Sequence, residues 1–233
     1  MAAEETSDDS KLLRFIQRWA ISPEEAKEIA RKYRTQSESK YSKDSASRHQ
    51  ARVADKIIAR YAKLSAMSGG ATALVGIVPG LGTALAALGG GLADTAVSMK
   101  LQVDMVCCLA ESFGYDLNAQ DARDLAFLIA AGGAIEKAGE QLGVKLASKA
   151  GVRLLREYLK GAALQAVKVF FKRVGIIFTR KALEKALPFG VGVVIGGTAN
   201  YALTRYVGAQ AKEWFILDQE MPEPGPREDQ AAA

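Results

Sequence analysis

The strongest constraint on the fold is a run of thirty residues without a charged side chain, from Leu64 to Ala93. One unbroken helix of that length would measure about 45 Å at about 1.5 Å per residue, more than the ~30 Å core of a bilayer requires. Pro79 lies in the middle of the run and leaves segments of fifteen and fourteen residues on either side. Each segment would be roughly 21–23 Å long as a helix, too short to span a bilayer. The run therefore predicts a helix–break–helix hairpin.

Glycine is frequent in this run and in a second uncharged stretch, Ala186 to Thr204, where Pro188 lies near the start. Glycine costs a helix about 1 kcal/mol relative to alanine, but small residues let two helix backbones approach closely. Two interpretations stay open: a tightly packed soluble core, or hairpins that enter or lie on a membrane. The residues expected to make these packing contacts are Gly82, Gly90, Gly91, Asp94, Gly196, Gly197 and Asn200.

A phosphate-binding loop is a third interpretation of these glycines, and the sequence disfavours it. The chain has no G-x-x-x-x-G-K-[ST] motif. Gly190, Gly192 and Gly196 fit a loosened dinucleotide fingerprint. That fingerprint requires a preceding strand within a βαβ unit, whereas the residues before Gly190 have a helical pattern.

Helical periodicity dominates the remaining sequence and strand signals are weak, so we predict an all-α fold. The expected architecture is a single multi-helix domain with two glycine-rich apolar hairpins and an N-terminal helical hairpin. Ser22 followed by Pro23 and two acids is typical of a helix start. The predicted first part, residues 1–34, is an acidic disordered start followed by a helical hairpin. The other predicted parts are a polar linker (35–50), the main helical domain (51–217) and a disordered acidic tail (218–233).

Positive charge is concentrated in one part of the chain. Residues 144–185 contain eleven basic residues and two acids, a local charge of +9, whereas the whole chain carries +5. Five of the cations recur at three- and four-residue spacing, which places them on one face of a helix. A solvated face, an anionic membrane surface, an acidic protein and nucleic acid are all open as explanations. These five residues, the basic stripe, are Lys145, Lys149, Arg153, Arg156 and Lys160.

No arrangement of residues for catalysis is recognisable. His49 is the only histidine and falls in the predicted linker, a poor platform for a catalytic triad. Cys107 and Cys108 are adjacent, so they rarely pair with each other, and with one histidine they do not make a typical zinc site. We expect no enzyme activity, no cofactor, no metal and no small-molecule substrate. Unpaired cysteines and an N-terminus without an apolar signal segment indicate the cytoplasm.

Two longer segments carry a family resemblance. They are GIVPGLGTALAALGGGLADTAVSMKLQVDMVCCLAESFGYDL (76–117) and ALPFGVGVVIGGTANYALTRYVGAQAKEWF (186–215). Over about residues 50–217 the chain resembles the EcsC family. The second segment carries the resemblance at Gly196, Asn200, Thr204, Arg205, Val207, Gly208 and Ala211. The resemblance implies a bacterial helical protein without an established enzymatic activity, named after a gene beside those of an ABC transporter. It supplies no catalytic residues.

These observations together predict a non-enzymatic protein at the cytoplasmic face of the inner membrane, peripheral or shallowly inserted. The glycine-rich hairpins would pack or insert, and the basic stripe would face anionic lipid. The alternative is a soluble helical adaptor with a protein partner, serving a transport or secretion system. Nucleic acid is disfavoured because the nearby aromatic residues, Tyr158, Phe170 and Phe171, suit a core rather than base stacking.

Overall fold

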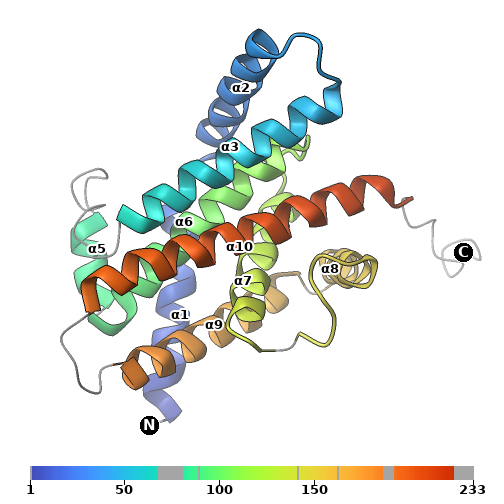
Figure 1. Ribbon diagram of the computed structural model, residues 1–233. Coiled ribbons are helices and arrows are strands. Elements are labelled where there is room, and N and C mark those ends of the chain that lie inside the picture. Colours follow the sequence, from blue (N-terminus) through green and yellow to red (C-terminus); the bar gives the residue numbers. More distant parts are fainter. Residues whose placement is uncertain are drawn as a thin grey trace, which may run out of the picture.

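The computed structural model confirms the all-α fold. It describes residues 2–67, 81–88, 90–140, 142–161, 163–185 and 192–222. Every regular element within those ranges is an α-helix (Figure 1). The helices are α1 (Ala2–Trp19), α2 (Pro23–Lys40), α3 (Ala46–Met67), α5 (Leu81–Leu88), α6 (Gly90–Ser112), α7 (Gln120–Lys137), α8 (Lys149–Gly161), α9 (Ala163–Lys185) and α10 (Gly192–Glu220).

Helix α6 is the centre of the core. All residues from Leu101 to Ala110 are buried, and α6 packs against α1, α2, α3, α5, α7, α9 and α10. The central part of this helix is covered on all sides, so its sequence shows little amphipathic pattern. The helix begins in the first glycine-rich stretch, at Gly90. The predicted break at Pro79 lies outside the described residues, as does Pro188.

One carboxylate is buried within this central helix. Asp104 accepts a hydrogen bond of 2.8 Å from the backbone N–H of Ile21 and forms a 2.5 Å ion pair with Lys100, one turn earlier in α6. Burial raises the pKa of Asp104, although Lys100 and the Ile21 amide act in the opposite direction. Because Ile21 lies between α1 and α2, this interaction attaches the corner between the two helices to α6.

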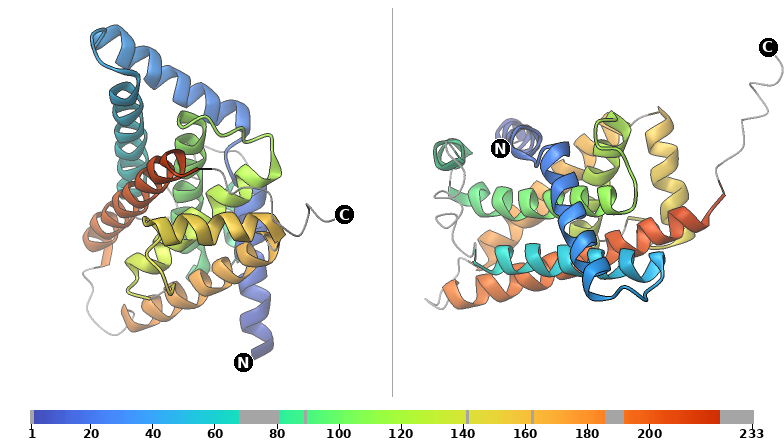
Figure 2. Two further views of the ribbon diagram at one scale, coloured as in Figure 1. Left: turned by 90° about the vertical axis from the view of Figure 1, so that its right-hand side faces the viewer. Right: turned by 90° about the horizontal axis from the view of Figure 1, so that it is seen from above.

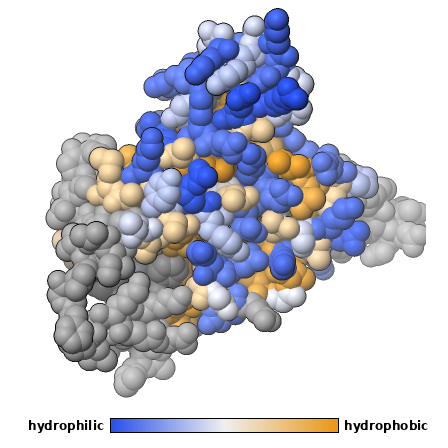
Figure 3. Space-filling model, in the orientation of Figure 1, coloured by the Kyte–Doolittle hydropathy of each residue, from blue (hydrophilic) through white to orange (hydrophobic). Residues whose placement is uncertain are grey.

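Helices α2 and α3 form an arm that projects from the body of the molecule (Figures 1 and 2). The predicted start of α2 is confirmed: Ser22 and Glu25 form a capping box. The predicted N-terminal hairpin takes a different form, because α1 packs on α5, α6 and α9, whereas α2 packs on α3 and α6. The antiparallel partner of α2 is therefore α3, and the face of the arm seen in Figure 3 is mainly hydrophilic.

The segment predicted as a polar linker or a ragged helix start, residues 35–50, is helical over most of its length. Helix α2 continues to Lys40, and α3 begins at Ala46. Polar contacts across the arm replace the missing apolar ones. The buried side chains of Ser37 and His49 are hydrogen-bonded at 2.9 Å, and the Arg52 guanidinium lies 3.8 Å from the centre of the Tyr41 ring. Both segments are therefore held as helices by side chains that look like solvated linker residues in the sequence.

The two predicted disordered ends also differ from the structure where it describes them. Residues 2–10 belong to α1 instead of a disordered start. Leu12, Phe15 and Ile16 of the same helix are buried in the common core, so α1 is part of the main helical body. Helix α10 extends to Glu220, three residues into the predicted tail. The tail from residue 223 lies outside the described residues.

Helices α10 and α3 cross closely at Gly208. A Cβ atom placed on Gly208 would lie 2.8 Å from Cγ1 and 2.9 Å from Cγ2 of Ile58, and 3.0 Å from Sδ of Met105. Distances below 3.0 Å require a neighbour to move, and the β-branched side chain of Ile58 has little freedom to do so. Glycine at this position sets how closely α10 can approach the core.

We predict that Gly208→Leu lowers the free energy of unfolding by about 1–3 kcal/mol, because the added side chain overpacks the α3–α10 crossing. Urea denaturation measures the change. Gly161→Leu is the matched control, since a Cβ at Gly161 meets no atom within 4 Å. Equal stability of the two variants would contradict the close crossing.

Candidate functional site

Helix α8 presents the strongest amphipathic pattern among the described helices. Ser148 begins the helix, because its hydroxyl accepts a 3.1 Å hydrogen bond from the N–H of Gly151. A Cβ at Gly151 would lie only 2.3 Å from the carbonyl oxygen of Leu146, so glycine is required for this tight entry. Val152 and Leu155 are buried beneath the helix. The opposite side of α8 is therefore the face available to a partner.

The structure places three of the five stripe residues together on that exposed face. Lys149, Arg153 and Lys160 are exposed and share it with the exposed acid Glu157. Lys145 is also exposed, but it lies in the segment before α8 begins. The stripe is thus shorter and less uniformly positive on the helix than the spacing predicted.

Arg156 does not belong to this exposed face. Its Nε atom lies 2.6 Å from Oδ1 of Asp218, and its guanidinium also donates to the carbonyl oxygens of Asp218 and Pro222, each at 2.9 Å. Only 15% of the Arg156 side chain is exposed. Tyr115 donates a hydrogen bond to the other carboxylate oxygen of Asp218. Arg156 therefore fastens α8 to the C-terminal end of α10.

Helix α9 carries a second exposed face, which the sequence prediction missed. Lys168 and Lys172 are exposed, and they recur at three- and four-residue spacing with three large aliphatic side chains. Leu164, Val169 and Ile176 are 51%, 56% and 46% exposed, respectively. The sequence pattern that could have predicted this face is the spacing that places large aliphatic residues beside lysines, because such a pattern is typical of helices that lie in a membrane interface.

Helices α8 and α9 follow each other in the chain, with one residue between them. The two helices contact each other, and the left-hand view of Figure 2 shows α8 (yellow) above α9 (orange). The edge of the Tyr158 ring meets Phe170 beneath them, with ring centres 6.2 Å apart. Arg173 on α9 forms a 3.3 Å ion pair with Glu140. We call the exposed residues Lys149, Arg153, Lys160, Leu164, Lys168, Val169, Lys172 and Ile176 the α8–α9 surface.

The glycine-rich residues chosen from the sequence are distributed over α5, α6 and α10. Gly90 and Gly91 begin α6, and Gly196 and Gly197 lie in the first turns of α10. Gly82 is half-buried in α5, whereas Asp94 is exposed on α6. The carbonyl of the half-buried Asn200 accepts a 3.4 Å hydrogen bond from Ser65, which joins α10 to α3. Their role in close packing stays a prediction.

The two cysteines lie in the interior of α6. Cys107 and Cys108 are buried and unpaired with each other, and the Tyr61 hydroxyl is 3.4 Å from Sγ of Cys108. Burial raises the pKa of Cys108 to about 12 and also raises that of Cys107. Within the described ranges, no cluster of three or more His, Cys, Asp or Glu side chains is arranged to hold a metal ion.

We predict that Arg156→Met lowers the free energy of unfolding by about 2–3 kcal/mol, because it leaves the Asp218 carboxylate without its charged donor in a partly buried site. Arg153→Met on the exposed face is the control and should change stability by less than about 0.5 kcal/mol. Denaturant titration of both variants shows whether Arg156 holds α8 to α10 or is only a surface cation. Similar losses of unfolding free energy in the two variants would count against this role of Arg156.

We also predict that neither cysteine reacts with an aromatic disulfide reagent at pH 8 in the native protein. The attacking species is the thiolate, which burial and a raised pKa suppress. Two thiols should react once the chain is unfolded in guanidinium. Rapid reaction of even one thiol in the native state would show that α6 is more accessible than the structure indicates.

Comparison with known proteins places the chain in a family. Among the described helices, none combines the length and apolar character needed to cross a bilayer. Searches of curated proteins and of solved structures found no match. The model of the EcsC protein family matches residues 11–217, which includes the second half of α1 and all of α2 and is wider than the 50–217 expected from the motifs. The chain belongs to the EcsC protein family.

Proposed function

We propose that this protein is a non-enzymatic, membrane-associated protein that binds anionic lipid at the cytoplasmic face of the inner membrane through the α8–α9 surface. The observation that carries the proposal is the exposed face of α9. Leu164, Val169 and Ile176 lie there among exposed lysines instead of in the core. Exposed aliphatic side chains beside cations suit a headgroup layer, which offers apolar depth and negative charge together.

Both kinds of side chain contribute to the proposed binding. A cation near an anionic membrane surface contributes about 1 kcal/mol. A fully buried aliphatic side chain contributes about 1.5–3 kcal/mol, and a half-exposed one gains only the part still open to solvent. Five exposed cations and three aliphatic side chains therefore supply attractions of similar size. Neither set outweighs the other, so we expect binding to fall when either set is removed.

Helix α8 takes a defined role in this proposal. Arg156 is occupied by Asp218 and therefore holds α8 in place, while Lys149, Arg153 and Lys160 face the lipid. Glu157 on the same face opposes part of the attraction. Residues 68–80 and 186–191, which are parts of the two uncharged glycine-containing stretches, lie outside the described residues, and the insertion of these stretches as hairpins belongs to the proposal as an additional contact.

We predict that Lys149→Glu combined with Arg153→Glu weakens binding to vesicles containing anionic lipid by roughly thirtyfold or more, from about 2 kcal/mol of lost attraction plus added repulsion. Vesicle co-sedimentation at 0.1 M salt measures the change. The control is Lys27→Glu combined with Lys63→Glu, which alters net charge equally at exposed positions on α2 and α3. Equal losses in both variants would reduce the effect to net charge and overturn the proposed surface.

Changing the salt concentration and substituting the aliphatic residues separate the electrostatic contribution to vesicle binding from the apolar one. Raising salt to 1 M shortens the Debye length from about 10 Å to about 3 Å, so the charge-reversal effect should shrink. Leu164→Ser with Val169→Ser and Ile176→Ser should weaken binding at both salt concentrations. If the unaltered protein ignores anionic vesicles at 0.1 M salt, the membrane proposal fails. The soluble adaptor, with an acidic protein surface as its target, then becomes the leading function.

A further inference from the structure

A groove of about 710 Å³ opens where the α1–α2 corner meets α3 and α6, away from the α8–α9 surface. About half of its lining residues are apolar or aromatic, including Trp19, Ile29, Tyr33, Leu64 and Leu101, and the others are charged. Trp19 and Leu64 are only half-buried, although each would gain from full burial. The volume falls within the roughly 300–1,000 Å³ of pockets that hold small organic molecules.

The groove also contains a polar floor. Lys100 and Asp104 line it, and their side chains are only 12% and 7% exposed. The Asp104 carboxylate is occupied by Lys100 and by the Ile21 amide. An ammonium group has three N–H donors, and the ion pair with Asp104 uses one of them. Lys100 is therefore placed to donate to an acceptor inside the groove.

The rim of the groove carries three cations and two acids. Arg18, Lys32 and Arg60 line it and are exposed. The acids at the rim are Glu25, which is engaged in the Ser22 capping box, and Glu28. The positive charge continues beyond the groove along α2.

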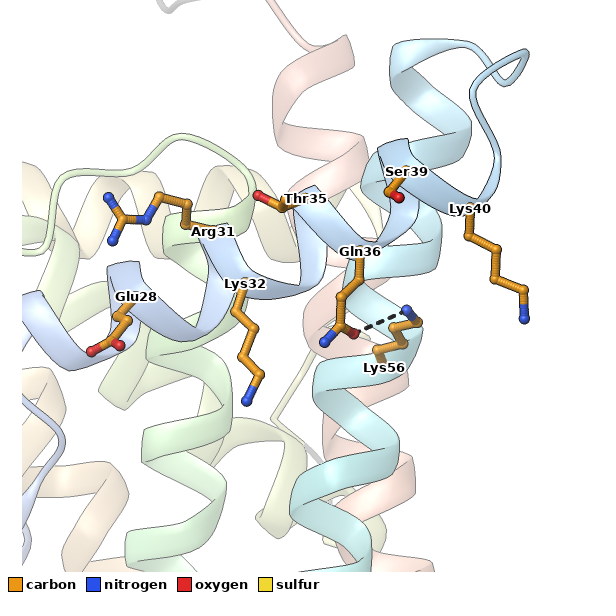
Figure 4. A pocket seen from close by; sticks show the side chains of 8 residues that line it. All are labelled: Glu28, Arg31, Lys32, Thr35, Gln36, Ser39, Lys40 and Lys56. Atoms are coloured by element: carbon orange, nitrogen blue, oxygen red, sulfur yellow. Dashed lines mark hydrogen bonds between the residues drawn. The ribbon is translucent and has the colours of Figure 1, made fainter.

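Figure 4 shows this continuation as a second hollow, between α2 and α3, which shares Glu28 and Lys32 with the groove. Four cations line the second hollow against the single acid Glu28. Lys56 reaches across from α3 and donates a 3.4 Å hydrogen bond to Gln36 on α2 (Figure 4). An anion that approaches the groove from this side meets a positive field.

We propose that this groove binds an amphiphilic anion, a molecule with an aliphatic or aromatic body and a phosphate or carboxylate head. The apolar walls take the body, because its burial covers half-exposed side chains such as Trp19 and Leu64. Arg18 and Arg60 at the rim, with Lys100 at the floor, supply charge-assisted donors for the head. A cationic or uncharged ligand would leave this set of donors without an anionic partner.

Trp19 provides a site-specific measurement. The chain has two tryptophans; Trp19 lines the groove, whereas Trp214 is 1% exposed in the core. In a Trp214→Phe background the emission reports Trp19 alone. Dodecyl phosphate, kept below the concentration at which it forms micelles, should shift this emission to shorter wavelength with a saturable dependence. If Trp214→Phe impairs folding, calorimetric titration of the unaltered protein with dodecyl phosphate measures the affinity instead.

The controls separate the groove from general attraction of anions. Arg18→Gln with Arg60→Gln should weaken dodecyl phosphate binding about tenfold or more. Lys27→Gln with Lys63→Gln removes two exposed cations that line neither hollow and should leave the affinity unchanged. Dodecyl maltoside, which has the same chain and no charge, should bind at least about tenfold more weakly. Absence of a saturable Trp19 response, equal binding of the two amphiphiles or equal losses in the two variants would overturn the proposal.

A further experiment decides whether the ligand comes from a membrane or from solution. A Trp19 shift with anionic vesicles as well as with the monomeric amphiphile assigns the site to a membrane lipid, and a shift with the monomer alone assigns it to a dissolved amphiphile. Lys149→Glu with Arg153→Glu should leave the monomer response intact. Failure of the α8–α9 surface and failure of the groove are therefore distinguishable.

Discussion

The carboxylate of Asp104 is buried in the central helix, and the placement of the N-terminal helices depends on how that charge is satisfied. Its partners are Lys100 and the amide of Ile21. Because an unpaired buried charge is costly, the corner between α1 and α2 is held at one point on α6. From that corner α1 turns into the core and α2 leaves it as one side of the arm. The groove lies at the same corner, so its position follows from the ion pair.

Features that arise from local periodicity could be predicted from the sequence. The all-α fold, the Ser22 cap and the amphipathic α8 each depend on residues within a few positions of one another. The arm could not be predicted in this way, because Ser37 and His49 satisfy each other only after two helices pair. Arg156 has the spacing of a stripe residue, yet its partner Asp218 lies 62 positions further along the chain. Pairing over that separation leaves no periodic signal.

The candidate surface was predictable only in part, for a related reason. Charge spacing placed Lys149, Arg153 and Lys160 on one helix face, and all three are exposed. It did not reveal the aliphatic side chains of α9, because Leu164, Val169 and Ile176 resemble core residues in a sequence that is already rich in such residues. Only the packing of α9 against α1, α6 and α7 shows which of its sides is covered. The proposed function depends on that distinction between covered and open apolar residues.

The connection between α7 and α8 has a consequence for the cooperativity of the fold. Gly139 and Gly143 both adopt positive φ angles in this connection, which other residues rarely adopt. Helix α8 thus lies beyond a sharply turned segment and contributes only three buried residues. Helix α6, by contrast, contacts nearly every other helix. Backbone amides of α8 should therefore exchange with deuterated solvent through local opening, whereas those in the middle of α6 should exchange only when the whole domain unfolds.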